Sequence, residues 1–366
     1  MFNKLLKDFT TTQIWEEMSI SENSQWHREP SVKAHTMMTL EWYDNFKAKD
    51  RTPKSQMLTR IALLFHDTGK PKAKQLAKDG ERFIYAGHEL ISARLFEDYI
   101  IQRPEFIELL GLELLDIRRI KWLIENHLPY GLTKPSKLQA FQQDLAAQEE
   151  DAVQSFFDML QSDAHGRISD DHKKKLEGVN IWIDSLVLTI DNDYECSSSK
   201  ELHILIGASG SGKSTLANKI SHIKYAHRFS LDDCREAFYE LSGAKKNYSS
   251  AWHYCCDNDQ AFTKYFQNEF VKTLKTYDQI ILDNTNTSTK SRRYWITLAR
   301  QQGFKIIGYE FLIDLATIID RQTTRSDKSV PAEAVTRQYF QITTPRIGSE
   351  VDETNVVLYG KVYSYK

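Results

Sequence analysis

The chain has 366 residues, more than one hydrophobic core usually organises, so two domains are expected. With 41% hydrophobic and 27% charged residues, its composition excludes the disordered, collagen-like and disulfide-scaffold classes. The four cysteines form no CxxC pair, which favours a reducing compartment, and we find neither a signal peptide nor an apolar run long enough to span a bilayer. We expect a cytoplasmic protein with no membrane partner.

The net charge of −2 is unevenly distributed along the chain. Residues 1–195 carry 25 Lys and Arg against 32 Asp and Glu, a balance of −7, and residues 196–366 carry 23 against 18, a balance of +5. An acidic segment suits carboxylate-rich metal chemistry, and a mildly basic one suits polyphosphate partners. Neither balance indicates nucleic-acid binding by itself.

Helical periodicity dominates the first half of the sequence. Apolar residues recur at helical spacing in four segments, 54–65, 88–101, 116–127 and 150–165. Turn signals such as Lys70-Pro71 separate these segments, and the one extended candidate is the turn-flanked stretch 82–85. The pattern predicts an all-α domain over residues 1–195.

The second half has a different pattern, which begins after the polar, serine-rich stretch 191–200. Short apolar runs of strand character occupy 201–206, 279–282 and 305–312, with helical segments between them. Alternating strands and helices predict a parallel sheet covered by helices over residues 196–366. The tyrosine-rich end, 351–366, alternates like a strand, which favours an added sheet edge over a base-stacking surface, and its role is left unassigned.

The most specific motif follows the first of these strands. Residues 207–214 read GASGSGKS, which fits GxxxxGK[ST] between a strand and a helix. Glycines let backbone N–H groups surround phosphates, Lys213 would reach the β- and γ-phosphates, and the Ser214 hydroxyl would bind Mg²⁺. The motif predicts a site for ATP with Mg²⁺ built from Gly207, Ser209, Gly210, Ser211, Gly212, Lys213, Ser214 and Thr215.

Carboxylates and arginines suited to phosphoryl transfer follow the loop. The segment 232–235 reads DDCR, 283–286 reads DNTN, and Arg321 and Arg325 lie ahead of Val330-Pro331. A carboxylate can accept the proton of an acceptor hydroxyl. Two arginines four residues apart share a helix face and can hold one polyphosphate.

With these segments, residues 200–345 resemble the 5′-OH polynucleotide kinases of the phage and bacterial end-healing type. The resemblance implies that Asp232 is the general base for the polynucleotide 5′-OH and that Arg235 contacts the acceptor on its 3′-phosphate side. It also implies that Arg325 is a lid arginine on the transferring phosphate, with Arg321 as its partner, and that Asp283 supports Mg²⁺ or the acceptor.

Simpler roles remain open for several of these residues. Asp233 and Asp283 could each cap a helix or stabilise a turn, and Arg321 and Arg325 could lie on a solvated helix face.

Histidines and aspartates recur at the predicted helices of the first half. His66 and Asp67 end one of them, in the sequence LFHDTGK. Imidazole and carboxylate groups suit a transition metal, which lowers the pKa of a bound water toward 7. We predict a divalent transition-metal site of His35, His66, Asp67 and Asp163, with Lys70, His88 and His127 as phosphate contacts, second-metal ligands or local donors.

This H…HD…D order over residues 25–170 is similar to that of the HD phosphohydrolase superfamily, and SDAHGR at 162–167 resembles its final aspartate segment. Members hydrolyse phosphomonoesters or phosphodiesters, including nucleotides and 2′,3′-cyclic ends. An HD domain followed by a polynucleotide kinase also resembles a bacterial family of fused end-healing proteins. The resemblance implies an HD metal-dependent phosphohydrolase domain at 1–195 and a P-loop polynucleotide kinase domain at 196–366.

The two-domain resemblance implies a bifunctional enzyme of RNA or DNA repair. The kinase would phosphorylate 5′-OH ends with ATP or another NTP, and the hydrolase would remove 2′-phosphate and 2′,3′-cyclic phosphate ends, leaving termini for a nucleic-acid ligase. Two alternatives stay open: an HD nucleotidase fused to a nucleoside or nucleotide kinase, and an HD sensor module that regulates a kinase.

Overall fold

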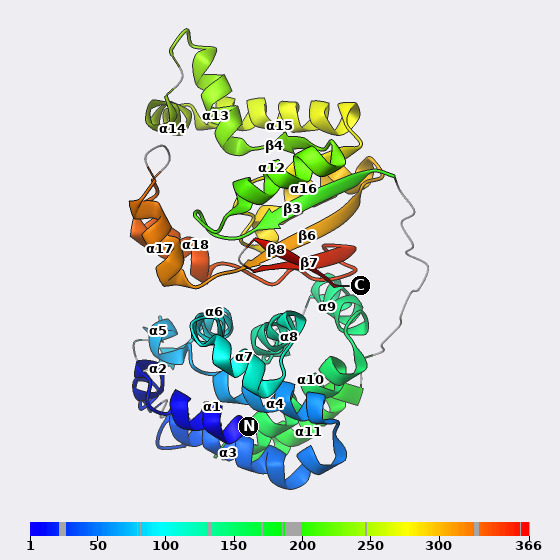
Figure 1. The fold of residues 1–366 in the computed structure, drawn as a ribbon. Coiled ribbons are helices and arrows are strands. Elements are labelled where there is room, and N and C mark those ends of the chain that lie inside the picture. The colour runs from blue at the N-terminus through cyan, green and yellow to red at the C-terminus, as the bar shows by residue number, and fades with distance from the viewer. Residues whose placement is uncertain are drawn as a thin grey trace. The chain divides into compact units, whose positions relative to one another are not determined.

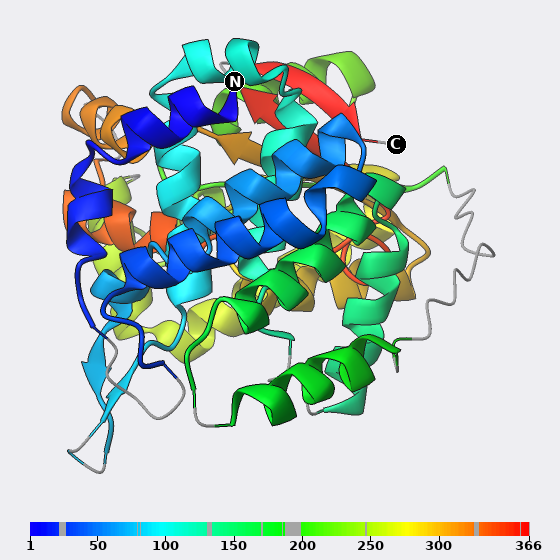
Figure 2. The same cartoon turned by 90° about the horizontal axis from the view of Figure 1, so that it is seen from below.

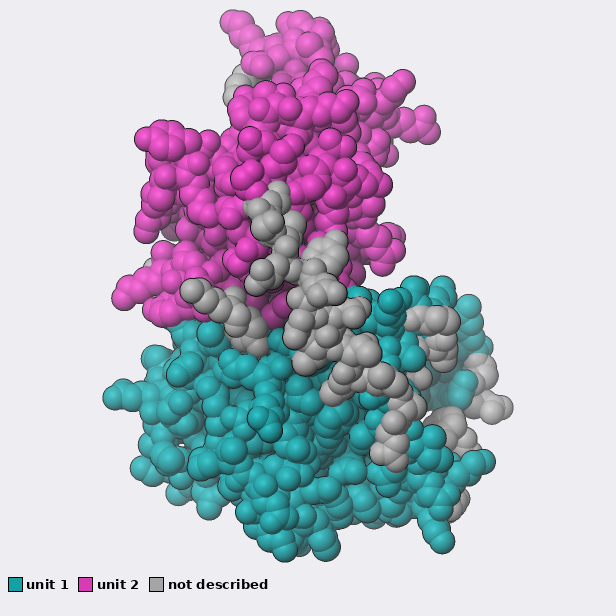
Figure 3. All heavy atoms as spheres, turned by 90° about the vertical axis from the view of Figure 1, so that its right-hand side faces the viewer, with its two compact units in different colours: residues 1–191 teal, residues 192–366 magenta. Residues whose placement is uncertain are grey.

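The computed structural model describes residues 1–366 except 22–26, 79, 81, 130–133, 170, 185, 187–198, 246, 326–328, 359 and 366. The chain divides into two compact units, Met1–Asp191 and Asn192–Lys366, which are coloured teal and magenta in Figure 3. Both this division and the predicted boundary near residue 195 fall outside the described residues. Within the described ranges, no helix is both long and apolar enough to cross a membrane.

Unit 1 is built almost entirely of helices, drawn from blue to green in Figure 1. The predicted helices 88–101 and 150–165 coincide with α6 and α10, and the other two predicted helices match α4 and α8 to within two residues. The helices are α1 (Phe2–Phe9), α2 (Gln13–Glu17), α3 (Val32–Phe46), η1 (Ala48–Asp50), α4 (Pro53–Phe65), α5 (Lys70–Ala73), α6 (His88–Ile101), α7 (Pro104–Leu110), α8 (Leu114–Glu125), α9 (Pro135–Ala146), α10 (Glu150–His165) and α11 (His172–Asp184).

Helix α4 occupies the centre of this unit. It begins where the Thr52 side chain accepts a hydrogen bond from the Ser55 backbone N–H, with Pro53 in the first turn. Its last five residues, 61–65, are all fully buried, so this end of the helix is apolar around its whole circumference, and the helix packs against α3, α8 and α10. Because α4 ends at Phe65, the next two residues, His66 and Asp67, lie among the surrounding helices.

The all-helical prediction for unit 1 is incomplete in one place. Strands β1 (Gln75–Leu76) and β2 (Phe83–Ile84) pair in antiparallel register, with Gln75 opposite Ile84 and Leu76 opposite Phe83. The turn-flanked candidate 82–85 therefore contains β2, but its partner strand was not predicted, because two residues are too few to establish a period.

Unit 2 contains a six-stranded sheet in the order β4-β5-β3-β6-β7-β8. All neighbouring pairs are parallel except β7 and β8, which are antiparallel. The predicted strands 201–206, 279–282 and 305–312 are confirmed without a shift, and the C-terminal segment adds the sheet edge as expected, as two strands. The strands are β3 (Glu201–Ile206), β4 (His227–Phe229), β5 (Gln279–Leu282), β6 (Lys305–Leu312), β7 (Glu353–Leu358) and β8 (Lys361–Tyr365).

Helices cover both faces of this sheet, as the alternation of β3 shows. Leu202, Ile204 and Ile206 point into a core shared with α15 to α18, whereas Leu205 points into a second core with α12. The helices are α12 (Lys213–Lys224), α13 (Leu231–Glu240), α14 (Tyr248–Asp257), α15 (Asp259–Thr276), α16 (Thr289–Gln301), α17 (Leu315–Thr323) and α18 (Ala332–Phe340). Loops after β4, β5 and β3, which are neighbours in the sheet, meet at its carboxyl edge, where parallel α/β sheets bind ligands.

Candidate functional sites in the two units

The glycine loop of unit 2 joins β3 to α12 in a conformation that requires glycine. Gly210 and Gly212 have φ of +95° and +98°, in the left-handed region that other residues rarely adopt. A Cβ atom on Gly210 would also lie 2.5 Å from Nε2 of Gln322, a residue of α17. The positive φ and the close backbone oxygen of Ile318, 3.1 Å from that Cβ position, therefore favour glycine at this position.

Lys213, the first residue of α12, is folded back onto the loop. Its Nζ donates to the Ala208 carbonyl at 2.7 Å and lies 3.4 Å from the Ser211 hydroxyl. Burial lowers the pKa of Lys213 to about 8, although the carboxylates of Asp283 and Asp232 act in the opposite direction. The ammonium is thus held where anionic phosphate oxygens would stabilise its charge.

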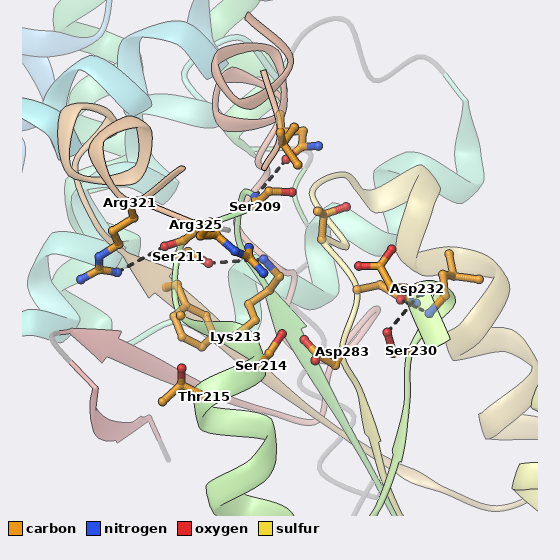
Figure 4. A pocket seen from close by; sticks show the side chains of 18 of the residues that line it. Ser209, Ser211, Lys213, Ser214, Thr215, Ser230, Asp232, Asp283, Arg321 and Arg325 are labelled. Atoms are coloured by element: carbon orange, nitrogen blue, oxygen red, sulfur yellow. Dashed lines mark hydrogen bonds between the residues drawn. The ribbon is translucent and has the colours of Figure 1, made fainter. Parts of the chain in front are cut away.

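A cavity of about 1570 Å³ opens beside the loop. Figure 4 shows Lys213, Ser214, Asp232 and Asp283 around one hollow, with Arg325 close to Lys213. The volume exceeds that of most small-molecule pockets, roughly 300–1,000 Å³. Every residue predicted for the ATP site except Gly207 lines this cavity, as do Arg235 and Asp283, so the phosphate loop and the predicted acceptor residues share one space.

Asp232 lies at the start of α13, one residue after the helix begins, and its carboxylate is held in place. Oδ1 accepts hydrogen bonds from Arg235 Nη1 at 2.6 Å and from the Tyr248 hydroxyl at 3.3 Å. The guanidinium of Arg235 in turn lies 4.4 Å from the centre of the Trp252 ring, and Trp252 remains 43% exposed in the cavity. One end of the cavity thus combines a carboxylate, a cation and an aromatic face.

Asp283 and Asp233 are joined by one arginine. Arg228 donates to Asp283 Oδ2 through Nε at 2.8 Å and to Asp233 Oδ2 through Nη1 at 2.6 Å. Asp283 is buried at the carboxyl end of β5, whereas Asp233 is about half exposed. Asp233 therefore faces a different partner from its neighbour Asp232.

The two predicted lid arginines line the same cavity, but they do not share a helix face. Helix α17 ends at Thr323, so Arg325 lies beyond the helix that carries Arg321. Arg321 Nη1 donates to the Gly210 carbonyl at 3.3 Å. The prediction that Arg321 and Arg325 lie on one helix face was wrong, because two residues at a four-residue spacing do not show where a helix ends.

In unit 1, the four predicted metal ligands converge from two helices, α3 and α10, and from the segment after α4. His35 Nε2 lies 2.9 Å from Asp163 Oδ1 and 3.3 Å from His66 Nε2. Asp67 Oδ2 lies 3.3 Å from His66 Nε2 and 3.5 Å from His35 Nε2. All four side chains are buried, so residues separated by up to 128 positions form one compact cluster.

The opposite oxygen of Asp67 faces a second histidine pair. Asp67 Oδ1 lies 3.1 Å from His88 Nε2 and 3.7 Å from His127 Nε2, and these two nitrogens are 3.2 Å apart. Lys70 Nζ contacts Oδ2 of the same carboxylate at 2.7 Å. Asp67 therefore lies between two histidine pairs, with one oxygen directed to each.

The tautomers of these histidines show what the cluster can bind. Nδ1 of each ring lies 2.7–3.1 Å from a backbone carbonyl, and because a carbonyl only accepts, each Nδ1 carries the proton. In the neutral rings, each Nε2 then presents a lone pair to its partner's Nε2 and to Asp67. A cation between these facing lone pairs would relieve their repulsion, and carbonyl-anchored imidazoles are typical of metal ligands. The residues therefore fit a divalent transition metal.

The pKa shifts in the cluster show how its charged groups depend on one another. Burial opposes charge on His66, but the carboxylates of Asp67 and Asp163 raise the pKa of His66 to about 10. Burial acts against ionisation of both aspartates as well, yet His66 and Lys70 hold the pKa of Asp67, and Arg167 that of Asp163, well below the usual range. Burial lowers the pKa of His127. The two buried carboxylates thus stabilise positive charge on the groups that contact them.

Several residues of these sites were not predicted from the sequence. Tyr248 and Trp252 are spaced by four residues on α14, an aromatic pair whose spacing could have indicated one helix face. Arg228 lies on the three-residue strand β4, which is too short to be found by periodicity. Arg167, which pairs with Asp163, lies within the segment SDAHGR and could have been noted there.

Comparison with known proteins supports the assignment of unit 2. A family model described as an AAA domain matches residues 202–345. The "Putative bifunctional polynucleotide kinase/RNA ligase" of Autographa californica nuclear polyhedrosis virus is 31% identical over 147 residues, which is 39% of this chain and 21% of that protein. This chain thus matches about a fifth of that relative's length. With the glycine loop and the parallel sheet, these matches show a P-loop kinase-like domain in unit 2.

A solved structure, a gluconokinase from Sinorhizobium meliloti 1021, matches with a TM-score of 0.30 and 15% sequence identity, covering 45% of this chain and 85% of that chain. A TM-score of this size is too low to bear on the function.

Proposed function

We propose that this protein is a bifunctional enzyme that heals nucleic-acid ends. Residues 196–366 act as a 5′-OH polynucleotide kinase, and residues 1–195 act as an HD-type metal-dependent phosphohydrolase. The observation that carries the kinase assignment is the single cavity that joins Lys213 and the glycine loop to Asp232 and Arg235. The name of the viral relative supports a polynucleotide as the acceptor.

The kinase residues fit phosphoryl transfer from ATP to a 5′-hydroxyl. Asp232 accepts the hydroxyl proton while a bond forms between the 5′ oxygen and the γ-phosphorus and the bond to the β-phosphate oxygen breaks. Lys213, Arg325 and Arg321 neutralise the phosphate charge, and Ser214, with Asp283 near it, holds the Mg²⁺ that accompanies ATP. Arg235, which donates a hydrogen bond to Asp232, would contact the next phosphate of the acceptor.

The exposed Trp252 gives the acceptor end of the cavity a surface for a nucleobase. We expect Trp252→Ala to raise the KM for a 5′-OH oligonucleotide roughly ten-fold, since stacking of one base on an aromatic ring is worth about 1–3 kcal/mol. Trp252→Phe should restore most of the affinity. Steady-state kinetics with Tyr225→Ala, an exposed aromatic outside the cavity, provides the control. An unchanged KM in Trp252→Ala would show that no nucleobase of the acceptor stacks on Trp252.

The lowered pKa of Lys213 predicts that ATP binding takes up a proton. Above pH 8, much of the buried amine is neutral in the free protein, and the charge of ATP phosphates raises its pKa again on binding. Calorimetric titrations in buffers of different ionisation enthalpy should therefore show net proton uptake above pH 8 that shrinks below it. In Lys213→Arg, whose guanidinium is always charged, the uptake should vanish. Equal uptake in both proteins would contradict this explanation.

The hydrolase assignment depends on the metal-binding geometry of unit 1. His35, His66, Asp67 and Asp163 would hold one divalent transition metal, and His88 and His127, with the second oxygen of Asp67, would hold another. A metal bound there supplies Lewis acidity toward water and phosphate. Lys70 can turn from Asp67 to a phosphate oxygen, and the backbone carbonyls keep the imidazoles oriented. Hydrolysis of 2′,3′-cyclic phosphate and 2′-phosphate ends would leave termini for a downstream ligase.

The acceptor class can be tested directly. Labelled ATP is supplied with either a 5′-OH oligonucleotide or a free nucleoside, and transfer to each is measured. The proposal predicts preferential labelling of the oligonucleotide. Labelling of the nucleoside alone would instead support an enzyme of nucleotide metabolism.

A further inference from the structure

The β1–β2 hairpin is attached directly to the histidine–aspartate cluster. It connects α5, which begins at Lys70, to α6, which begins at His88. The Tyr85 carbonyl, one residue after β2, accepts the hydrogen bond from His88 Nδ1 at 2.7 Å. A Cβ atom on Gly69 would lie 2.3 Å from the His88 carbonyl oxygen, so the two segments at the base of the hairpin touch backbone to backbone. The base of the hairpin is therefore fixed at the cluster.

Beyond that base, the rest of unit 1 leaves the side chains of the hairpin strands exposed. All four strand residues are exposed, and Leu76, Phe83 and Ile84 expose 58%, 46% and 39% of their surface. Figure 2 shows the hairpin, in light blue, extending from the helical body. A lone two-stranded hairpin is marginally stable in water, so its apolar side chains add little to the core. Their exposure indicates a surface for a ligand.

The chemistry of this surface fits a polyanion with bases. Residues 74–84 contain three Lys or Arg and two Asp or Glu, a balance of +1, whereas residues 1–195 as a whole carry −7. Lys74 Nζ lies 4.1 Å from the centre of the Phe83 ring, which combines a cation and an aromatic face. Proteins that bind single-stranded nucleic acid use this combination, with basic groups on phosphates and aromatic rings under bases.

We infer that the described residues of the hairpin, among them Lys74, Lys78, Arg82 and Phe83, hold the single strand whose phosphorylated 3′ end is presented to the histidine–aspartate cluster. The inference rests on the proposed hydrolase function and adds to it the surface that binds the strand upstream of the phosphorylated end. Phosphates upstream of the end contact Lys74, Lys78 and Arg82, and a base stacks on Phe83. A mononucleotide is too short to reach this surface.

The inference is tested by comparing two substrates of the same end chemistry. Lys74→Ala/Phe83→Ala should raise the KM for an oligoribonucleotide ending in a 2′,3′-cyclic phosphate roughly ten-fold, because a stacking and a phosphate contact are lost. Hydrolysis of a 2′,3′-cyclic mononucleotide should be unchanged. Phe46→Ala, which removes a 60% exposed phenylalanine from the far end of α3, should change neither.

Two results would overturn the inference: an unchanged KM for the oligonucleotide, or an equal change for both substrates. A wild-type protein that hydrolyses neither substrate would contradict the proposed hydrolase instead. In that case an oligonucleotide carrying 4-thiouridine beside its 3′-phosphate end is photo-crosslinked to the full chain. Crosslinks in residues 74–84 would support the docking surface, and crosslinks confined to other peptides would exclude it.

Discussion

Asp67→Asn is expected to abolish hydrolysis of 2′,3′-cyclic phosphate and 2′-phosphate ends while leaving 5′-kinase activity near that of the wild type. Asp67 is the residue that faces both histidine pairs, so the amide removes the charge that would hold a metal on either side. The loss should exceed about 100-fold, since residues that only hydrogen-bond a metal ligand are already worth about 10–100-fold. Paired assays on one preparation, one for each activity, provide the measurement.

A buried carboxylate outside the cluster provides the matched control. Asp158 is as buried as Asp67 and pairs with Arg51 in the same unit, so Asp158→Asn tests the cost of neutralising a buried acid without touching the metal site. It should keep both activities if it folds. Full hydrolysis by a folded Asp67→Asn protein would show that the cluster is not the catalytic site. Joint loss of both activities would show that the two units depend on each other.

Asp232→Ala and Lys213→Ala are expected to disable the kinase for different reasons. Loss of the proposed base should slow transfer by about 10²–10⁴-fold while ATP still binds. Loss of the ammonium at the β- and γ-phosphates should slow transfer to a similar extent and weaken ATP binding as well. Kinetics of 5′-end labelling, with ATP affinity measured separately, distinguish the two effects.

The neighbouring aspartate is the control for this pair. Asp233 pairs with Arg228 and not with Arg235, so Asp233→Ala should have a much smaller effect on transfer than Asp232→Ala. Both alanine variants at 213 and 232 should retain hydrolysis of cyclic ends. If Asp232→Ala transfers phosphate normally and Asp233→Ala does not, the base has been assigned to the wrong residue.

The sequence predicted those parts of the fold that have a local signal. The glycine loop combines a motif with a strand before it and a helix after it, and strands β3, β5 and β6 are long enough to show their apolar character. Strands β4, β1 and β2 have two or three residues each, so no period marks them, and only the flanking turns indicated β2. The end of α17 before Arg325 also has no clear local signal, because the polar residues there suit a helix or a turn.

Within the sites, residue types were easier to predict than pairings. The histidine and aspartate set could be selected by type and order, but only the folded chain places one oxygen of Asp67 toward each histidine pair. Likewise, Arg235 was selected from the resemblance to polynucleotide kinases, whereas its contact with Trp252 depends on how α13 packs against α14. Long-range packing determines these contacts, and a single sequence contains no local record of it.

The central claim is that one chain heals both ends of a broken strand, and one measurement tests it directly. An oligoribonucleotide with a 5′-OH and a 2′,3′-cyclic phosphate is incubated with the full chain, ATP, Mg²⁺ and a transition metal such as Mn²⁺, and the products are resolved by mass spectrometry. The account predicts a strand that gains a 5′-phosphate and loses its terminal phosphate. An oligonucleotide left unchanged at both ends, while free nucleosides or nucleotides are converted under the same conditions, would contradict it.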